Sequence, residues 1–377
     1  MKIALLCHKY SLRMGGLERD TVLLSREMLK AGHEVHIFAN RCEDKVPGMN
    51  FHHVPMLHIS SPGKNLSFAL SAKQKLAGKN FDIIQSMDRI LHQDIFRVSD
   101  GINPVQMIHR YPNPMIRRVF AATPRRLALK WLEEKIFIHG GTRMILAISG
   151  MIKQEIVEHY GVSPEKIAVI YNGIDTSVFQ PGVKEKYRKS IRDMYSIRDD
   201  EILLLFISND HKRKNLDAVL EAMRVIGDKK YRLLVVGDGR ISPYQKKAGK
   251  YRIENQVSFL GHRPKIERYF GAADIFVFPS HYDAFGNVCL EAMACGLPVI
   301  VSGKCGASEL IQNGKDGIIL EKNRVAYLAE SISMLEDRSL RNDIGNYAAV
   351  TAAQYTMEKH LTELLELYAY VMQMKEK

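Results

Sequence analysis

The chain has 377 residues, of which 46% are hydrophobic and 25% charged, the usual balance of a globular protein. This length suits two domains, and the composition excludes a disordered chain, a collagen-like repeat and a coiled coil. No window reaches the roughly 18 consecutive apolar residues of a membrane-spanning helix. The formal net charge of +12 favours anionic partners, such as phosphorylated small molecules, acidic lipid or nucleic acid.

The first predicted element is a buried strand over residues 3–7. This apolar run meets His8 and Lys9 at once, so it is too short for a secretory signal. The five cysteines are scattered and have no metal-ligand spacing, which indicates free thiols in a reducing compartment. We therefore predict a cytoplasmic protein.

Short β-branched runs alternate with longer helical patterns along the whole chain, as in parallel sheets covered by helices on both faces. In the first half we expect strands at 3–7, 34–39, 82–85, 95–99 and 144–148. Helices are expected near 17–31, 66–77, 116–138 and 151–160, with Ser149 as N-cap and Gly161 as the stop of the last one.

A turn-rich segment at 171–182 suits a linker, and a second series of strands follows it. These strands are expected at 203–207, 233–236, 257–259, 275–278, 299–301 and 317–320, before a final helix near 357–374. We therefore predict an α/β protein with two doubly wound, Rossmann-like domains that face each other across a cleft. The expected bounds are 1–172, 173–356, and 357–377 for a helix that packs back toward the N-terminal domain.

The unusual residues of the second series follow the carboxyl ends of the predicted strands, where ligands bind in such sheets. They are Arg213, Lys214, Gly237, His262, Arg263 and the run Asp283–Asn287. Together they offer backbone amides, cations and a carboxylate, which an anionic, hydroxyl-rich ligand requires. Arg213 and Lys214 alone would also fit a solvated turn, but at this edge they can neutralise a leaving diphosphate.

The run Phe285-Gly286-Asn287 leads into a predicted helix whose free N–H groups suit a phosphate. Asp283 before this helix and Glu291 inside it can accept sugar and ribose hydroxyls. On spacing alone, a helix-capping Asp283 and a solvated Glu291 are the favoured alternative.

In the first series, Gly15 and Gly16 follow the first strand and would let a phosphate approach the backbone. The sequence has neither GxGxxG with a ribose-binding acid nor a P-loop, which disfavours a nicotinamide enzyme and a P-loop protein.

In combination, these residues resemble the family-4 retaining glycosyltransferases, which have the GT-B fold, and the resemblance extends over essentially the whole chain. The stretch 283–300 resembles the E-x7-E signature of the family, with Asp283 in place of the first glutamate. Supporting similarities lie at 147–150, 171–175 and 271–274. Within the family, the N-terminal half is most similar to the lipopolysaccharide core glucosyltransferases that use UDP-glucose and a heptose acceptor.

The resemblance implies retaining transfer of a hexose from a nucleotide sugar, UDP-glucose favoured, to a lipid-linked envelope glycan such as the lipopolysaccharide core. It implies that Asp100, Arg213, Lys214 and Asp283 are catalytic and that Asp20 lies on the acceptor side. Donor contacts are implied for Gly15, Gly16, Gly237, His262, Arg263, Phe285, Gly286, Asn287 and Glu291.

The resemblance also implies that neither a metal nor a cofactor is needed, in keeping with the lack of a DxD triplet in the sequence. Three alternatives on the same fold are a sugar-nucleotide epimerase, a phosphorylase and a non-catalytic glycan-binding protein.

The segment 101–132 has no acidic residue, and its cations alternate with apolar residues. The cations are Arg110, Arg117, Arg118, Arg125, Arg126 and Lys130. Such a segment suits the surface of an anionic membrane leaflet. A solvated helix face is the alternative, and a nucleic-acid patch ranks last because no RNA-binding aromatic signature is present. We therefore expect peripheral association with the inner face of the plasma membrane.

Overall fold

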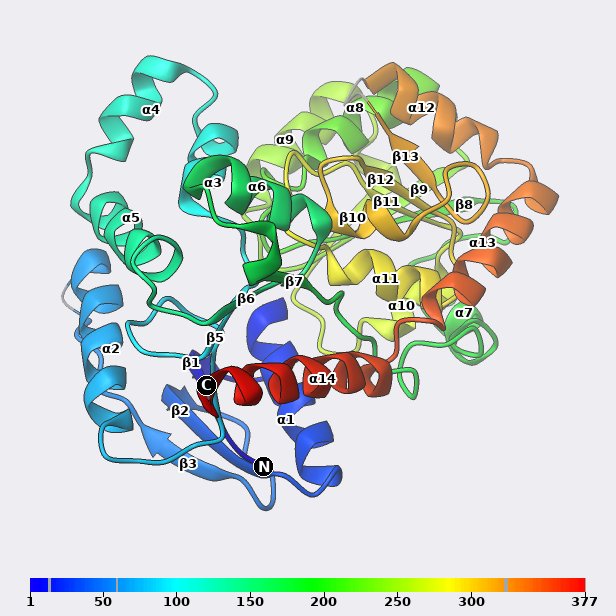
Figure 1. The fold of residues 1–377 in the computed structure, drawn as a ribbon. Coiled ribbons are helices and arrows are strands. Elements are labelled where there is room, and N and C mark those ends of the chain that lie inside the picture. Colours follow the sequence, from blue (N-terminus) through cyan, green and yellow to red (C-terminus); the bar gives the residue numbers. More distant parts are fainter. Residues whose placement is uncertain (13–14, 59, 322–324, 377) are drawn as a thin grey trace. The chain divides into compact units, whose positions relative to one another are not determined.

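The computed structural model describes residues 1–12, 15–58, 60–321 and 325–376, so Lys377 of the predicted last helix lies outside the described residues. The chain forms two compact units, residues 1–173 with 357–377, and residues 174–356 (Figure 1). The predicted pair of doubly wound parallel sheets is confirmed.

Within the described residues, the first unit holds a seven-stranded parallel sheet in the order β3-β2-β1-β4-β5-β6-β7. Its strands are β1 Lys2–Tyr10, β2 Glu34–Cys42, β3 Asn50–His53, β4 Ile83–Ser86, β5 Ile95–Val98, β6 Met144–Ala147 and β7 Ile167–Val169. Its helices are α1 Gly16–Lys30, α2 Ser61–Leu76, α3 Asn103–Arg110, α4 Pro114–Ala121, α5 Pro124–Phe137, α6 Gly150–Tyr160 and α14 Met357–Glu376.

The two faces of this sheet are buried against different helices because side chains alternate along a strand. On one face, Ile3 and Leu5 of β1 belong to a cluster with residues of α1 and α14. On the other face, Ala4 and Leu6 pack in a cluster with Phe68 of α2. Helix α14 thus completes the first unit, as predicted, and Figure 1 shows it in red beside α1.

The second unit holds a six-stranded parallel sheet in the order β10-β9-β8-β11-β12-β13, counted in its described residues. Its strands are β8 Ile202–Ile207, β9 Tyr231–Val236, β10 Val257–Gly261, β11 Ile275–Phe278, β12 Val299–Ser302 and β13 Ile318–Leu320. Its helices are α7 Val183–Met194, α8 Leu216–Ile226, α9 Ser242–Tyr251, α10 Glu267–Ala272, α11 Asn287–Ala294, α12 Val325–Met334 and α13 Arg338–Ala352.

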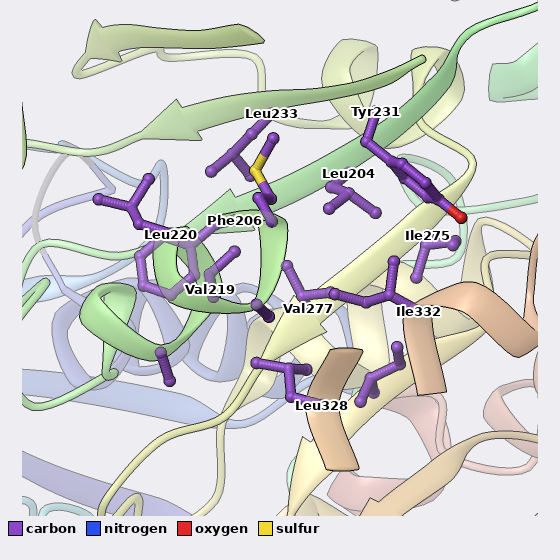
Figure 2. Packing of buried hydrophobic residues seen from close by; sticks show 14 of the residues in the cluster. Leu204, Phe206, Val219, Leu220, Tyr231, Leu233, Ile275, Val277, Leu328 and Ile332 are labelled. Atoms are coloured by element: carbon purple, nitrogen blue, oxygen red, sulfur yellow. The ribbon is translucent and has the colours of Figure 1, made fainter. Parts of the chain in front are cut away.

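The core of the second unit lies between its central strands and two helices. Figure 2 shows Phe206 of β8 beside Val219 and Leu220 of α8, and Leu204, Leu328 and Ile332 belong to the same cluster. Since both faces of the sheet are apolar, polar groups are left to the loops at its edges.

The structure differs from the predicted elements at several places, and helix α3 is one element that was not predicted. The helix expected over 116–138 is two helices, α4 and α5, because Thr123 precedes Pro124 and has an extended backbone that a helix cannot continue through. Strand β3 was not predicted because its sequence, Asn-Phe-His-His, lacks an apolar run. Strand β7 has only three residues, too few for a periodic pattern.

We predict that a histidine of α14 makes the stability of the first unit fall as the pH decreases. His360 is 5% exposed and its Nδ1 lies 2.7 Å from the carbonyl oxygen of Tyr171, to which it donates. Burial, aided by the charge of Arg97, lowers the pKa of His360 from 6.5 to about 4. The unfolded chain therefore binds the proton first, and stability present above pH 6.5 is lost between pH 6.5 and 4.

Urea unfolding followed by the fluorescence of Trp131, the single tryptophan, reports on this unit. Between pH 8 and 4.5 the wild type should lose roughly 2–3 kcal/mol through this group. In His360→Gln the free energy of unfolding should depend less on pH than in the wild type. Substitution of the exposed His159 of α6 should leave the wild-type pH dependence unchanged. Parallel pH profiles of wild type and His360→Gln would contradict the assignment.

Candidate functional site

The loop after β8 presents two neighbouring cations in different environments. Asp210 turns this loop by accepting the N–H of Arg213 at 3.1 Å, and its other oxygen lies 3.3 Å from Nε of that arginine. The side chain of Arg213 is 46% exposed, whereas that of Lys214 is 7% exposed. The loop therefore offers one half-exposed cation and one buried cation.

The buried cation forms an ion pair with a carboxylate from another loop. Lys214 Nζ contacts Asp283 Oδ2, and it also lies 5.0 Å from the ring centroid of Phe278 at the end of β11. The side chain of Asp283 is 16% exposed. The structure thus brings together Lys214 and Asp283, which lie 69 residues apart in the sequence.

Burial acts against both charges of this pair. It raises the pKa of Asp283, but attraction to Lys214 and Arg213 and the N–H of Phe285 outweigh it, so that this pKa lies below its ordinary value. Burial lowers the pKa of Lys214. The charge of Asp283 raises it and that of Arg213 lowers it further, so that this pKa lies below its ordinary value. Because Nζ directly contacts the carboxylate, we describe the pair as an ammonium and a carboxylate.

The Asp283 loop is held by its backbone on both sides. The N–H of Asp283 donates to Lys304 at 2.9 Å, and its carbonyl accepts the N–H of Gly306 at 3.0 Å. The loop ends at Gly286, whose φ of 88° is in the left-handed region that favours glycine. A Cβ there would also lie 2.7 Å from Sγ of Cys305. Helix α11 begins directly after this turn, at Asn287.

Two predicted donor residues near α11 are buried. The Phe285 side chain is 1% exposed, and its backbone N–H donates to Asp283 Oδ1 at 3.2 Å, so a donor contact of this residue would use its backbone. Glu291, in the second turn of α11, is 6% exposed rather than solvated. The favoured alternative from spacing alone, a solvated Glu291, is therefore wrong.

The loop after β9 contacts both the loop after β8 and the loop after β10. Gly237 has a φ of 127°, and a Cβ there would lie 2.0 Å from the carbonyl oxygen of Ser208, so only glycine fits. The side chain of Asp238 accepts the N–H of His262 at 3.1 Å, and Arg263 donates to the His262 carbonyl at 3.1 Å. His262 keeps 47% of its side chain exposed. These contacts fix the backbone of the loops at this edge of the second sheet.

At the corresponding edge of the first sheet, the glycine pair has an acidic neighbour. Gly15 caps α1 with an ordinary φ of −70°, and a Cβ there would lie 3.3 Å from Glu18 Oε2. Burial raises the pKa of Glu18, and the charge of Asp88 raises it further. The donor contact predicted at Gly15 and Gly16 would therefore lie beside the Glu18 carboxyl group at the start of α1.

The two predicted acceptor-side carboxylates are each held by an arginine. Asp20 of α1 lies 3.3 Å from Nη2 of Arg97, a buried residue of β5. Asp100, two residues beyond the end of β5, lies 3.3 Å from Nη2 of Arg89, and 58% of its side chain is exposed. Both carboxylates therefore lie near the carboxyl end of β5 and point in defined directions.

The basic segment 101–132 covers α3, α4 and most of α5. Helix α4 has no buried residue, and Met115 and Val119 are 79% and 70% exposed. Arg110, Arg118, Arg125 and Lys130 are exposed and Arg117 is half-buried. Arg126 is 8% exposed and donates to Asn103 Oδ1 at 2.7 Å, so its predicted role at a membrane surface is wrong.

Several residues of these edges were not predicted. Arg97 also donates to Asn172 Oδ1 at 2.7 Å, and His8 Nδ1 lies 2.6 Å from Asp88 Oδ1. Arg89 joins Asp100 to Glu133 of α5. Each partner comes from a different element, so no spacing in the sequence indicates these pairs. The only signal would have been a lone arginine inside the apolar strand β5.

Two further properties concern the described part of the chain. No group of three or more His, Cys, Asp or Glu side chains there is arranged to hold a metal ion. None of its helices has the length and apolar character needed to cross a bilayer.

Two family models match this chain. The model described as "Glycosyltransferase Family 4" matches residues 14–178, and "Glycosyl transferases group 1" matches residues 187–351. The first lies almost entirely in the first unit and the second within the other unit.

Two proteins that are similar to this chain over most of their length are named as enzymes. N-acetyl-alpha-D-glucosaminyl L-malate synthase of Bacillus anthracis is 26% identical, over 98% of this chain and 96% of its own. Lipopolysaccharide glucosyltransferase WaaG of Escherichia coli (strain K12) is 23% identical, over 85% of each chain.

Solved structures share the fold. A crystal structure of WaaG superposes with a TM-score of 0.84 at 22% identity, covering 97% of this chain and 99% of that one. Anabaena Alr3699/HepE in complex with UDP-glucose gives a TM-score of 0.78 at 18% identity, covering 98% and 100%. With its two parallel-sheet units and its charged strand-end loops, the chain is an enzyme of glycosyltransferase family 4 with the GT-B fold.

Proposed function

We propose that this protein transfers a hexose from UDP-glucose to a lipid-linked envelope glycan such as the lipopolysaccharide core, with retention and without a divalent metal. In this proposal residues 173–356 bind the nucleotide sugar, residues 1–172 bind the acceptor, and the enzyme works at the cytoplasmic face of the inner membrane.

The observation that carries the proposal is the charge arrangement at the edge of the second sheet. The buried Lys214 is fixed by Asp283, the exposed Arg213 is adjacent, and α11 begins just beyond. Breaking the bond between a sugar and a diphosphate leaves negative charge on the phosphate oxygen. Fixed cations and the N–H groups of a helix start stabilise such charge without further reorganisation.

The proposed transfer needs no covalent intermediate on the enzyme. The bond between the anomeric carbon and the diphosphate oxygen breaks, and the acceptor oxygen bonds to that carbon on the same face. The acceptor's hydroxyl proton passes to the departing diphosphate. In this scheme Arg213 and Lys214 take the part that a divalent ion has elsewhere.

The remaining donor contacts are proposed by their place at the same edge. Glu291 would accept the ribose hydroxyls from α11, while Gly237, His262 and Arg263 would frame the uracil. The neighbour HepE is known with UDP-glucose bound, which supports UDP-glucose as donor here.

The acceptor is proposed from the similarity to WaaG and from the exposed basic segment. WaaG is named a lipopolysaccharide glucosyltransferase, and Asp20 and Asp100 would face the acceptor in this chain. The relative from Bacillus anthracis is named an L-malate synthase. The acceptors tested in transfer assays should therefore also include small hydroxy acids.

The first prediction concerns the buried cation. Lys214→Met should lower kcat/KM for UDP-glucose about 100-fold, the cost of removing one fixed charge-stabilising group. Methionine is similar in size to lysine. The double variant Lys214→Met with Asp283→Asn avoids leaving a buried carboxylate unpaired. Lys212→Met changes an exposed cation two residues away and should have little effect. Equal activity of the Lys214 and Lys212 variants at equal folded fractions would contradict the proposal.

The second prediction concerns the donor and the metal. UDP and UDP-glucose should raise the thermal midpoint more than GDP or ADP sugars, since ligand binding stabilises the folded protein. Glu291→Ala should abolish most of this shift. Transfer should continue at an unchanged rate in EDTA. A metal requirement, or release of sugar phosphate with inorganic phosphate instead of transfer, would refute the mechanism.

The third prediction concerns the membrane. Flotation should recover the protein with vesicles containing anionic phosphatidylglycerol. Arg118→Gln and Arg125→Gln should each weaken this binding about fivefold, from roughly 1 kcal/mol per cation. Met115→Ser with Val119→Ser should weaken it further. Val350→Ser on α13 alters a comparably exposed valine and should leave binding unchanged. If none of the substitutions in α4 and α5 weakened vesicle binding, the basic segment would not be the membrane-binding surface.

A further inference from the structure

Arg89 connects two parts of the first unit through one side chain. It lies in the loop between β4 and β5, and its side chain is 12% exposed. Its Nε lies 2.7 Å from Glu133 Oε1 of α5. Its Nη2 donates to Asp100 Oδ1 at 3.3 Å and to the carbonyl oxygen of Gly101 at 2.9 Å. One planar guanidinium therefore spans from α5 to the loop after β5.

The anchor of this arginine, Glu133, is a completely buried carboxylate with several donors. Its side chain is 0% exposed, and its two oxygens accept the N–H of Asn103 at 2.9 and 3.1 Å. Tyr160 of α6 donates its hydroxyl to the same carboxylate. Burial lowers the pKa of Arg89, but attraction to Asp100 and Glu133 outweighs this effect and raises the pKa above its usual range. The position of the guanidinium is thus fixed by α3, α5 and α6.

The other partner, Asp100, is held on one side and open on the other. More than half of its side chain is exposed, so its carboxylate can reach a ligand while Arg89 limits its rotation. The backbone next to it is restrained as well, because Arg89 binds the Gly101 carbonyl and Gln106 donates to the Asp100 carbonyl at 2.7 Å.

We propose that Arg89 is a positioning residue for the transfer reaction, which orients the Asp100 carboxylate from a buried anchor at Glu133. This inference rests on the proposed function, in which Asp100 faces the acceptor. The planar fork of an arginine donates in two directions at once, whereas a lysine ammonium is a point charge on a flexible stem. Holding a substrate-orienting group rigidly is a means by which enzymes raise rates.

A purely structural role would give a different pattern. If Arg89 only neutralised Glu133, its loss would lower stability and affect all kinetic constants through the folded fraction. If it positions Asp100, its loss should reduce acceptor turnover in the folded enzyme and should have no further effect once Asp100 is altered.

The test is a cycle of variants assayed with UDP-glucose and a soluble acceptor glycan. Arg89→Met with Glu133→Gln removes the anchor without leaving a buried unpaired charge. Together they should lower kcat/KM for the acceptor about tenfold and leave KM for UDP-glucose within twofold. Asp100→Asn should lower the same constant at least as much. The triple variant should be no worse than Asp100→Asn by more than twofold.

A single conservative variant provides the second measurement. Arg89→Lys keeps a positive charge beside Glu133 and should keep the thermal midpoint, but it should lose most of the acceptor rate. Arg143→Gln removes another acid-paired arginine of the same unit, 3.6 Å from Asp94, and should match the wild type. Wild-type rates in Arg89→Lys, or additive losses in the triple variant, would overturn the inference.

These experiments distinguish a failure of the positioning role of Arg89 from a failure of the proposed function. A wild type that binds UDP but transfers no sugar to any acceptor refutes the proposed function and this inference together. A wild type that transfers glucose while the Arg89 variants match it refutes only the positioning role.

Discussion

Parallel strands impose one constraint on which both units depend: all carboxyl ends lie at the same edge of the sheet, and both faces are covered by helices. Polar groups then gather mainly in the loops at the edges. In the second unit, the loops after β8, β9 and β10 touch through Ser208, Gly237 and Gly261. The charged residues of the proposed donor site are therefore neighbours because of the sheet and not because of their order in the chain.

Within these edges, buried charges are held as pairs. Lys214 with Asp283, Arg89 with Glu133, and Arg97 with Asp20 each combine a buried or nearly buried cation with a carboxylate from another element. Such pairs contribute little net stability, because desolvation offsets their attraction. Their effect is geometric: a paired side chain has one direction, and a group that must meet a reacting phosphate or hydroxyl needs one direction.

The sequence was sufficient for the parts of this protein that depend on local patterns. Continuous apolar runs such as the one in β8 predicted the strands, and the positions after them placed Lys214 and Asp283 at one edge of the sheet. The pairing of those two residues could not be predicted, since it depends on the packing of β11 beside β8. Arg89 and Glu133 were missed for the same reason: they lie 44 residues apart and meet only in the folded unit.

The sequence does not show which side chains of a motif are buried. Phe285 belongs to a recognisable motif, and its ring is 1% exposed. Arg126 is one of several cations in a basic segment, yet helix α5 turns it inward toward Asn103. In both cases the sequence shows which residue is present, and only the helix rotation or turn geometry shows which way it points.

The place of α14 has a consequence for how the protein is made. Residues 174–356 leave the ribosome before α14, so the second unit has all of its strands while the first still lacks one of the two helices that cover Ile3 and Leu5. During synthesis the earliest part of the chain is therefore among the last to be shielded, and nascent chains should stay sensitive to proteases within 1–173 until α14 has emerged.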